Sequence, residues 1–162
     1  MTWRNPPPLE PSKPKPGKKI TPEDLAKSGS EDGHQAALFC WAADSLDRFP
    51  QLKWMHAIPN GGSRHIAEAT KMVAAGTRSG VWDIFLPCPV RQPHDSIAPD
   101  GAYHGLYIEM KEPKRRNHKN GGLSEEQVNF GQYAKNAGYR CAVCYTWEEA
   151  RDVIVNYLKG KL

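Results

Sequence analysis

Hydrophobic residues in the first third of the chain recur at helical spacing. Leu38, Trp41, Ala42 and Phe49 fall on one face of a helix. Such a stripe of apolar side chains is typical of a helix that packs against a core. The pattern therefore predicts a long helix over residues 31–47.

Two polar residues continue this apolar face toward the start of the predicted helix. Glu31 and Gln35 lie at the same helical spacing, so we expect them either at the rim of the core or in a cleft. A third interpretation is a solvated helix start, where the helix dipole favours an acidic side chain. The spacing alone leaves all three open.

Short apolar runs predict the strands. Residues 81–86 are largely apolar, as in a central strand, whereas residues 106–111 alternate between apolar and polar. A third strand is expected over residues 139–145, and a short one over residues 52–58 leads into a Pro-Asn-Gly-Gly turn. Residues 87–104 are rich in Pro, Asp and Gly, which predicts a long exposed loop.

Capping signals predict the remaining helices. Ser124 is followed at the capping-box spacing by Gln127, and Thr146 by Glu149. A further helix is expected over residues 65–75. The resulting order is helix, strand, helix, strand, strand, helix, strand, helix. This order predicts an α/β fold with a central mixed β-sheet flanked by helices.

Length and composition predict one folded domain with an N-terminal tail. A chain of 162 residues suits a single domain with its own core. Residues 1–20 hold six of the 14 prolines and several lysines, a composition that favours disorder. We therefore predict a flexible tail over residues 1–28, with a short helix at residues 21–24, and one domain over residues 29–162.

The absence of targeting signals and the cysteine pattern predict a cytoplasmic protein without a disulfide framework. No run in the sequence approaches the roughly 20 apolar residues that cross a bilayer, and the first residues lack the apolar segment of a signal peptide. Cys141 and Cys144 form a CxxC that suits half a zinc site or a redox pair. Residues three apart on a strand point to opposite faces, which favours two small buried hydrophobes instead.

A modest positive charge suits a polyanionic partner. The formal net charge is +4, and residues 111–119 carry five basic residues against one acidic residue. Clustered basic residues favour contacts with a phosphate backbone, although the alternative is an ordinary solvated loop. The candidate residues for contacts with such a phosphate backbone are Arg64, Lys71, Arg78, Lys114, Arg115, Arg116 and Lys119. The lysine-rich tail is expected to add a contribution that does not depend on base sequence.

The chemistry is concentrated on two predicted strands. Residues two apart on a strand share a face, so Glu109 and Lys111 project together while Met110 turns into the core. If Asp83 lies on a neighbouring strand of a hairpin, two carboxylates and one ammonium group converge. The alternative is a solvated strand face with an ordinary cross-strand pair.

Such a cluster suits phosphodiester hydrolysis with a divalent cation. Asp83 and Glu109 are the expected ligands of Mg²⁺ or Mn²⁺, and the backbone carbonyl of Met110 is a further candidate. The expected role of Lys111 is to hold or help deprotonate the attacking water and to stabilise the developing negative charge.

The sequence resembles the VRR-NUC (virus-type replication-repair nuclease) domain of the PD-(D/E)XK nucleases over roughly residues 30–158. The resemblance rests on the runs AIPNGGSR, AAGTRSGVWDIFLP, HGLYIEMK, GGLSEEQ and AGYRCAVCYTWEEA. It implies a restriction-endonuclease-like core. One departure is Trp82, which stands where a proline is usual in the family and is expected to alter entry into the strand more than the chemistry.

The resemblance also implies an active site whose residues come from several segments. Its members would be Glu31 as a further metal ligand, Asp83, Glu109 with Lys111, and Gln127. Supporting positions are implied at Gln35, Asn60 and Gly61. For Gln127 the residues themselves leave an alternative, because a glutamine at this position can simply close the capping box.

The function implied is that of a Mg²⁺- or Mn²⁺-dependent DNA endonuclease. The resemblance implies selectivity for branched DNA such as a Holliday junction, a role in replication, recombination or repair, and a homodimer. Two alternatives remain: a restriction-type or nicking endonuclease of the same fold, and a non-catalytic DNA-binding protein.

Overall fold

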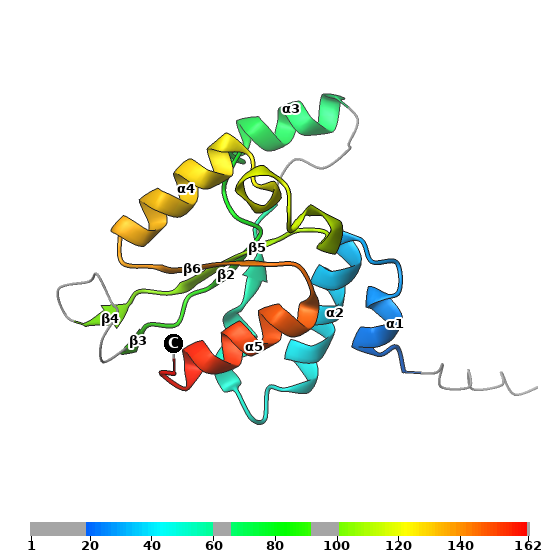
Figure 1. The fold of residues 1–162 in the computed structure, drawn as a ribbon, viewed down its shortest axis with the longest axis vertical. Helices are drawn as coiled ribbons and strands as arrows, with labels where there is room; N and C mark the ends of the chain where they lie inside the picture. The colour runs from blue at the N-terminus through cyan, green and yellow to red at the C-terminus, as the bar shows by residue number, and fades with distance from the viewer. Residues whose placement is uncertain (1–18, 60–65, 92–100, 162) are drawn as a thin grey trace, which may run out of the picture.

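The computed structural model describes residues 19–59, 66–91 and 101–161 (Figure 1). The helices are α1 (Pro22–Ala26), α2 (Glu31–Asp44), α3 (Ile66–Ala74), α4 (Glu125–Asn136) and α5 (Trp147–Leu158). The strands are β1 (His56–Ala57), β2 (Ile84–Leu86), β3 (Val90–Arg91), β4 (Ala102–Tyr103), β5 (Leu106–Met110) and β6 (Arg140–Cys144). Short 3-10 helices are η1 (Pro50–Trp54), η2 (Pro113–Arg115) and η3 (Lys119–Gly122).

Four strands form the central sheet in the order β1-β2-β5-β6. The pairs β1–β2 and β2–β5 are antiparallel, and β5–β6 is parallel. Helices α2 and α5 cover one face, and α4 lies over the other (Figure 1). The structure thus confirms the predicted α/β fold with a mixed sheet flanked by helices.

Each face of the sheet has its own apolar cluster. The main core joins α2 and α5 to the sheet and includes the fully buried Leu38, Ile108 and Ile154. The smaller cluster lies under α4 and contains Trp82 and Ala134. Successive residues of β5 therefore point to opposite faces of the sheet and contact different clusters.

The two cysteines of the CxxC follow the same alternation. Cys141 belongs to the cluster under α4, whereas Cys144 belongs to the main core. Both are buried free thiols, and burial raises the pKa of Cys141 to about 11 and that of Cys144 to about 12. The prediction of two small buried hydrophobes on opposite strand faces is confirmed.

Helix ends follow their caps. Helix α2 begins after Ser30, whose hydroxyl accepts a hydrogen bond from the Gly33 N–H at 3.1 Å. It ends at Asp44, three residues before the predicted end. The Thr146 hydroxyl caps α5 by accepting from the Glu149 N–H at 3.3 Å. The predicted reciprocal bond is wrong, because the Glu149 carboxylate accepts from the Tyr145 N–H instead.

The segment predicted as a long exposed loop is partly ordered. Strands β3 and β4 pair as an antiparallel ribbon, and Tyr103 is buried in the main core. The hydroxyl of Tyr157 in α5 donates to the Cys88 carbonyl at 2.7 Å. Polar composition predicted an exposed loop, but these buried aromatic contacts hold both ends of the segment against the core.

The N-terminal part of the described chain packs on the domain. The short helix predicted at residues 21–24 is present as α1, with a full capping box between Thr21 and Asp24. Its Leu25 and Ala26 pack against the main core. Residues 1–18 of the predicted tail lie outside the described residues. No described helix is long and apolar enough to cross a membrane.

Candidate active site

The antiparallel register of β2 and β5 brings Asp83 to Glu109. Ile84 pairs with Ile108, so the residue before β2 lies beside the end of β5. The Oδ2 atom of Asp83 accepts a hydrogen bond from the Met110 N–H at 3.0 Å. One acidic side chain is therefore fixed against the backbone of the strand that carries the other.

Lys111 lies at the centre of this acidic group. Its backbone N–H donates to the Cys144 carbonyl at 2.9 Å, which extends the pairing of β5 with β6. Its Nζ lies 2.5 Å from Glu109 Oε1, 3.1 Å from the Met110 carbonyl oxygen and 3.6 Å from Glu31 Oε2. The side chain is almost fully buried, so its ammonium is held in one place.

Gln127 makes contacts of both kinds that the sequence left open: it closes the capping box, and it reaches Glu109. Its Oε1 accepts from the Ser124 N–H at 3.0 Å, and its backbone N–H donates to the Ser124 hydroxyl at 3.2 Å, which completes the capping box of α4. Its Nε2 also donates to Glu109 Oε1. The cap fixes the amide so that its free end reaches the carboxylate.

Glu31 and Gln35 approach the group from α2. Glu31 is half-buried and pairs with Lys111 across the end of the sheet. Gln35 follows one turn later and is also partly buried. The contact of Glu31 with the strand carboxylates therefore runs through the lysine. Asn60 and Gly61 lie outside the described residues.

The protonation equilibria reflect burial of like charges. Burial and the Asp83 charge raise the pKa of Glu109 to about 8, against the opposing effect of Lys111. Burial also raises the pKa of Glu31, with Lys111 again opposing. Burial lowers the pKa of Lys111, but the hydrogen bond and charge of Glu109, with Glu31 and Asp83, outweigh this effect and raise it. The site therefore favours a positive charge among its carboxylates.

The donor set fits a hard divalent cation. The Oε2 atom of Glu109 is buried and, within the described part of the chain, has no hydrogen-bond partner, so a bound cation would satisfy this oxygen and favour the ionised carboxylate. No group of three or more His, Cys, Asp or Glu side chains among the described residues is arranged to hold a metal. Mg²⁺ needs fewer, since one or two carboxylates with water and substrate phosphate suffice.

The sequence assigned no chemical task to Trp82, and the structure gives it a position behind the site. The indole Nε1 donates to the Gln127 carbonyl at 2.9 Å. The ring is buried and lies so close to Gly131 that a Cβ there would be 2.6 Å from it. Trp82 and Gly131 are distant in sequence and meet only in the folded chain, so the sequence alone gives no signal of this contact.

The predicted DNA-binding residues differ in the contacts that they make. Lys114 forms an ion pair with Glu112 at 2.8 Å, and Arg116 pairs with Glu149 while its guanidinium carbon lies 4.2 Å from the Tyr145 ring centroid. Lys71 and Lys119 are exposed. Arg115 lies 3.9 Å from Glu112, and Arg78 donates to the backbone carbonyls of Val73 and Thr77. Arg64 lies outside the described residues.

Comparison with solved structures finds the same architecture in a VRR_NUC domain protein. The two chains share 23% sequence identity and superpose with a TM-score of 0.56, over 80% of this chain and 88% of the other. No family model matches the sequence, and no curated protein does. The likeness shows that this chain has the fold of a VRR_NUC domain protein. In this chain the described site lies at one end of the mixed sheet.

Proposed function

We propose that this protein is a metal-dependent nuclease that hydrolyses phosphodiester bonds in DNA. The observation that carries the proposal is the buried Glu109 carboxylate, which lies beside Asp83 and is bonded to both Lys111 and Gln127. An ion pair alone does not explain why this carboxylate is buried, because removing a carboxylate from water can cost more free energy than the ion pair contributes. The fold shared with a VRR_NUC domain protein supports the same chemistry.

The protein residues supply positioning and charge. Asp83, Glu109 and the Met110 carbonyl oxygen would hold Mg²⁺ or Mn²⁺, with Glu31 as a further candidate ligand. The ion would polarise the scissile phosphate and lower the pKa of a bound water. Lys111 donates hydrogen bonds to the attacking oxygen and stabilises negative charge as it develops. Gln127 holds the Glu109 carboxylate in a fixed orientation.

The test of this function separates cleavage from folding and metal binding. Purified protein is incubated with Mg²⁺ or Mn²⁺ and DNA, and Lys111→Ala is compared with Lys53→Ala, which removes an exposed lysine elsewhere on the surface. We expect Lys111→Ala to bind DNA but to lose at least about 100-fold in cleavage rate, a loss of the size seen when one charge-stabilising donor is removed. Cleavage by Lys111→Ala at the wild-type rate would end the proposed mechanism.

Metal binding has its own readout. Asp83→Asn and Glu109→Gln are each compared with the wild type by calorimetric titration with Mn²⁺ and by the shift of the melting temperature. The expected result is a clear Mn²⁺-induced rise for the wild type and a much smaller one for both variants. Equal stabilisation of all three proteins would remove these residues from the metal site.

We also propose that the substrate is branched DNA and that the protein acts as a homodimer. Two symmetric active sites can cut two strands of a junction, so we expect a panel of duplex, flap, splayed-arm and four-way-junction DNA to show preference for a branched substrate. Cleavage at one defined duplex sequence would favour a restriction-type or nicking enzyme. Tight DNA binding by the wild type without cleavage in Mn²⁺ would favour a non-catalytic binding protein.

A further inference from the structure

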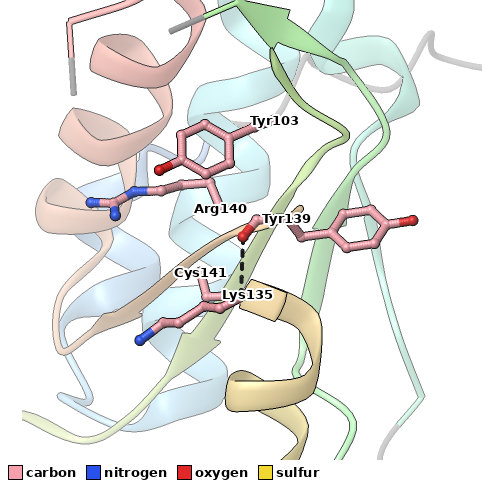
Figure 2. A pocket seen from close by; sticks show the side chains of 5 residues that line it. All are labelled: Tyr103, Lys135, Tyr139, Arg140 and Cys141. Atoms are coloured by element: carbon pink, nitrogen blue, oxygen red, sulfur yellow. Dashed lines mark hydrogen bonds between the residues drawn. The ribbon is translucent and has the colours of Figure 1, made fainter. Parts of the chain in front are cut away.

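A cavity lies at the start of β6, away from Lys111. Its volume is about 210 Å³, and its lining residues are Tyr103, Lys135, Tyr139, Arg140 and Cys141. Lys135 and Arg140 extend to the same side of the cavity, and the Tyr103 ring lies next to Arg140 (Figure 2). The Tyr139 ring points the other way (Figure 2). Because clefts for drug-sized ligands measure about 300–1,000 Å³, this cavity suits a small chemical group.

The cavity has two cations, and the described residues provide no acidic partner for them. Neither Lys135 nor Arg140 forms an ion pair with any part of the chain that the structure describes. The charges that act on the Cys141 thiol at the cavity wall are those of the same two residues. The cavity therefore has a positive potential that the described residues leave uncompensated.

A buried donor points to the type of ligand. The Nε of Arg140 is buried and lacks a hydrogen-bond partner among the described residues. A buried N–H without an acceptor is unfavourable, and native proteins rarely leave one unpaired. The planar guanidinium matches the oxygens of a phosphate group, and a nearby lysine adds a point charge. An oxyanion in the cavity would balance the charge and accept hydrogen bonds from the guanidinium and the ammonium groups.

We propose that this cavity is a second phosphate-binding site and that it holds a backbone phosphate of the DNA. The choice of DNA as the source rests on the proposed nuclease function. Arg140 pairs with Leu106, whereas Cys144 pairs with Met110, so the cavity lies four residues along β6 from the active site. At about 3.3 Å per residue this is roughly 13 Å, a separation that one DNA duplex can span.

A contact of this kind fixes the position of DNA without reading its bases. Lys135→Ala and Arg140→Gln are compared with Lys53→Ala, which removes one exposed charge outside the cavity. Binding of a fluorescent duplex and of a four-way junction is measured over a range of salt concentrations without divalent metal, so that no strand is cut.

We expect both cavity variants to bind several-fold more weakly than the wild type, whatever the base sequence. Each lost phosphate contact should reduce the slope of log K against log salt concentration by about 0.9 for duplex DNA. Lys53→Ala should keep the wild-type slope. Lys135 is exposed at the end of α4, so its removal should leave the melting temperature unchanged. Wild-type affinity and slope in Lys135→Ala and Arg140→Gln would overturn the proposal.

A titration followed by NMR distinguishes the source of the phosphate and does not depend on cleavage. The Arg140 Nε–H signal of ¹⁵N-labelled full-length protein is monitored as inorganic phosphate or uncleavable DNA is added. A shift with DNA supports a backbone contact. A shift with inorganic phosphate alone keeps the anion site but overturns DNA as its source, and no shift with either overturns the site. Failure of the nuclease function would appear separately, as absence of cleavage, and would leave the phosphate titration interpretable.

Discussion

The indole Nε1 of Trp82 donates a hydrogen bond to the backbone carbonyl of Gln127 at 2.9 Å. The same Gln127 donates through its side chain to the Glu109 carboxylate. A buried tryptophan on the approach to β2 is thereby joined to the candidate catalytic carboxylate through the first turn of α4. A proline at this position would have no side-chain donor, so Trp82 provides a link between β2 and α4 that a proline could not.

Trp82→Phe tests this link as a positioning contact. The variant keeps an aromatic ring but loses the donor, and a buried hydrogen bond contributes about 1 kcal/mol to stability. We expect kcat for DNA cleavage to fall about tenfold or more while KM changes little, because small displacements of catalytic groups are costly. Steady-state cleavage kinetics measure both parameters.

Trp147→Phe is the matched control for that variant. Trp147 is also buried, but it lies in the main core on α5. Its loss should lower the melting temperature comparably and leave kcat unchanged. Equal kcat values in the two variants would show that Trp82 contributes only packing.

Ser124→Ala separates the cap of α4 from the contact with Glu109. The Ser124 hydroxyl accepts from the Gln127 N–H, and loss of such an N-cap costs about 1 kcal/mol. Gln127→Ala should lose the reciprocal capping bond and also the donor to Glu109. We expect both variants to melt at a lower temperature but only Gln127→Ala to lose most of its cleavage activity. If Ser124→Ala loses as much activity, the amide acts only through helix stability.

Tyr157→Phe tests the anchoring of the segment that carries β3. The Tyr157 hydroxyl is part of a fully buried side chain and donates to the Cys88 carbonyl. Removing it should cost about 1 kcal/mol, the usual net contribution of one hydrogen bond. Tyr133→Phe, at a side chain that is 68% exposed, should cost almost nothing. Chemical denaturation measures the difference, and equal unfolding free energies would show that the bond contributes no net stability.

The buried thiols should react slowly because they are poorly ionised. Burial raises the pKa of Cys141 to about 11 and of Cys144 to about 12, and the thiolate is the reactive form. At pH 8, labelling of the native protein should therefore modify Cys40 and Cys88, which are partly exposed, much faster than the other two. All four should react at similar rates in denaturant. Mass spectrometry of the labelled peptides locates the sites, and rapid native labelling of Cys144 would contradict its burial in the core.

Local patterns determined much of the fold. Periodicity and capping residues predicted α2, α4, α5 and the strands β2, β5 and β6, because these elements depend on neighbours in sequence. The strand predicted over residues 52–58 is mostly wrong, because η1 covers its first part and only His56–Ala57 is a strand. The alternation in β5 also placed Glu109 and Lys111 on one face and Met110 in the core, as found. The paired β3 and β4 were missed because their contacts with α5 are distant in sequence.

The sequence by itself determined which residue types were available to the site and in which order they occur. Only the tertiary structure decided that the Lys111 ammonium lies between the carboxylates of Glu109 and Glu31, and that Gln127 serves its own helix and Glu109 together. These contacts depend on the register of β2 with β5 and on the packing of α2 and α4 against the sheet. Such long-range geometry is set by the burial of the whole core and leaves no trace in the local spacing of residues.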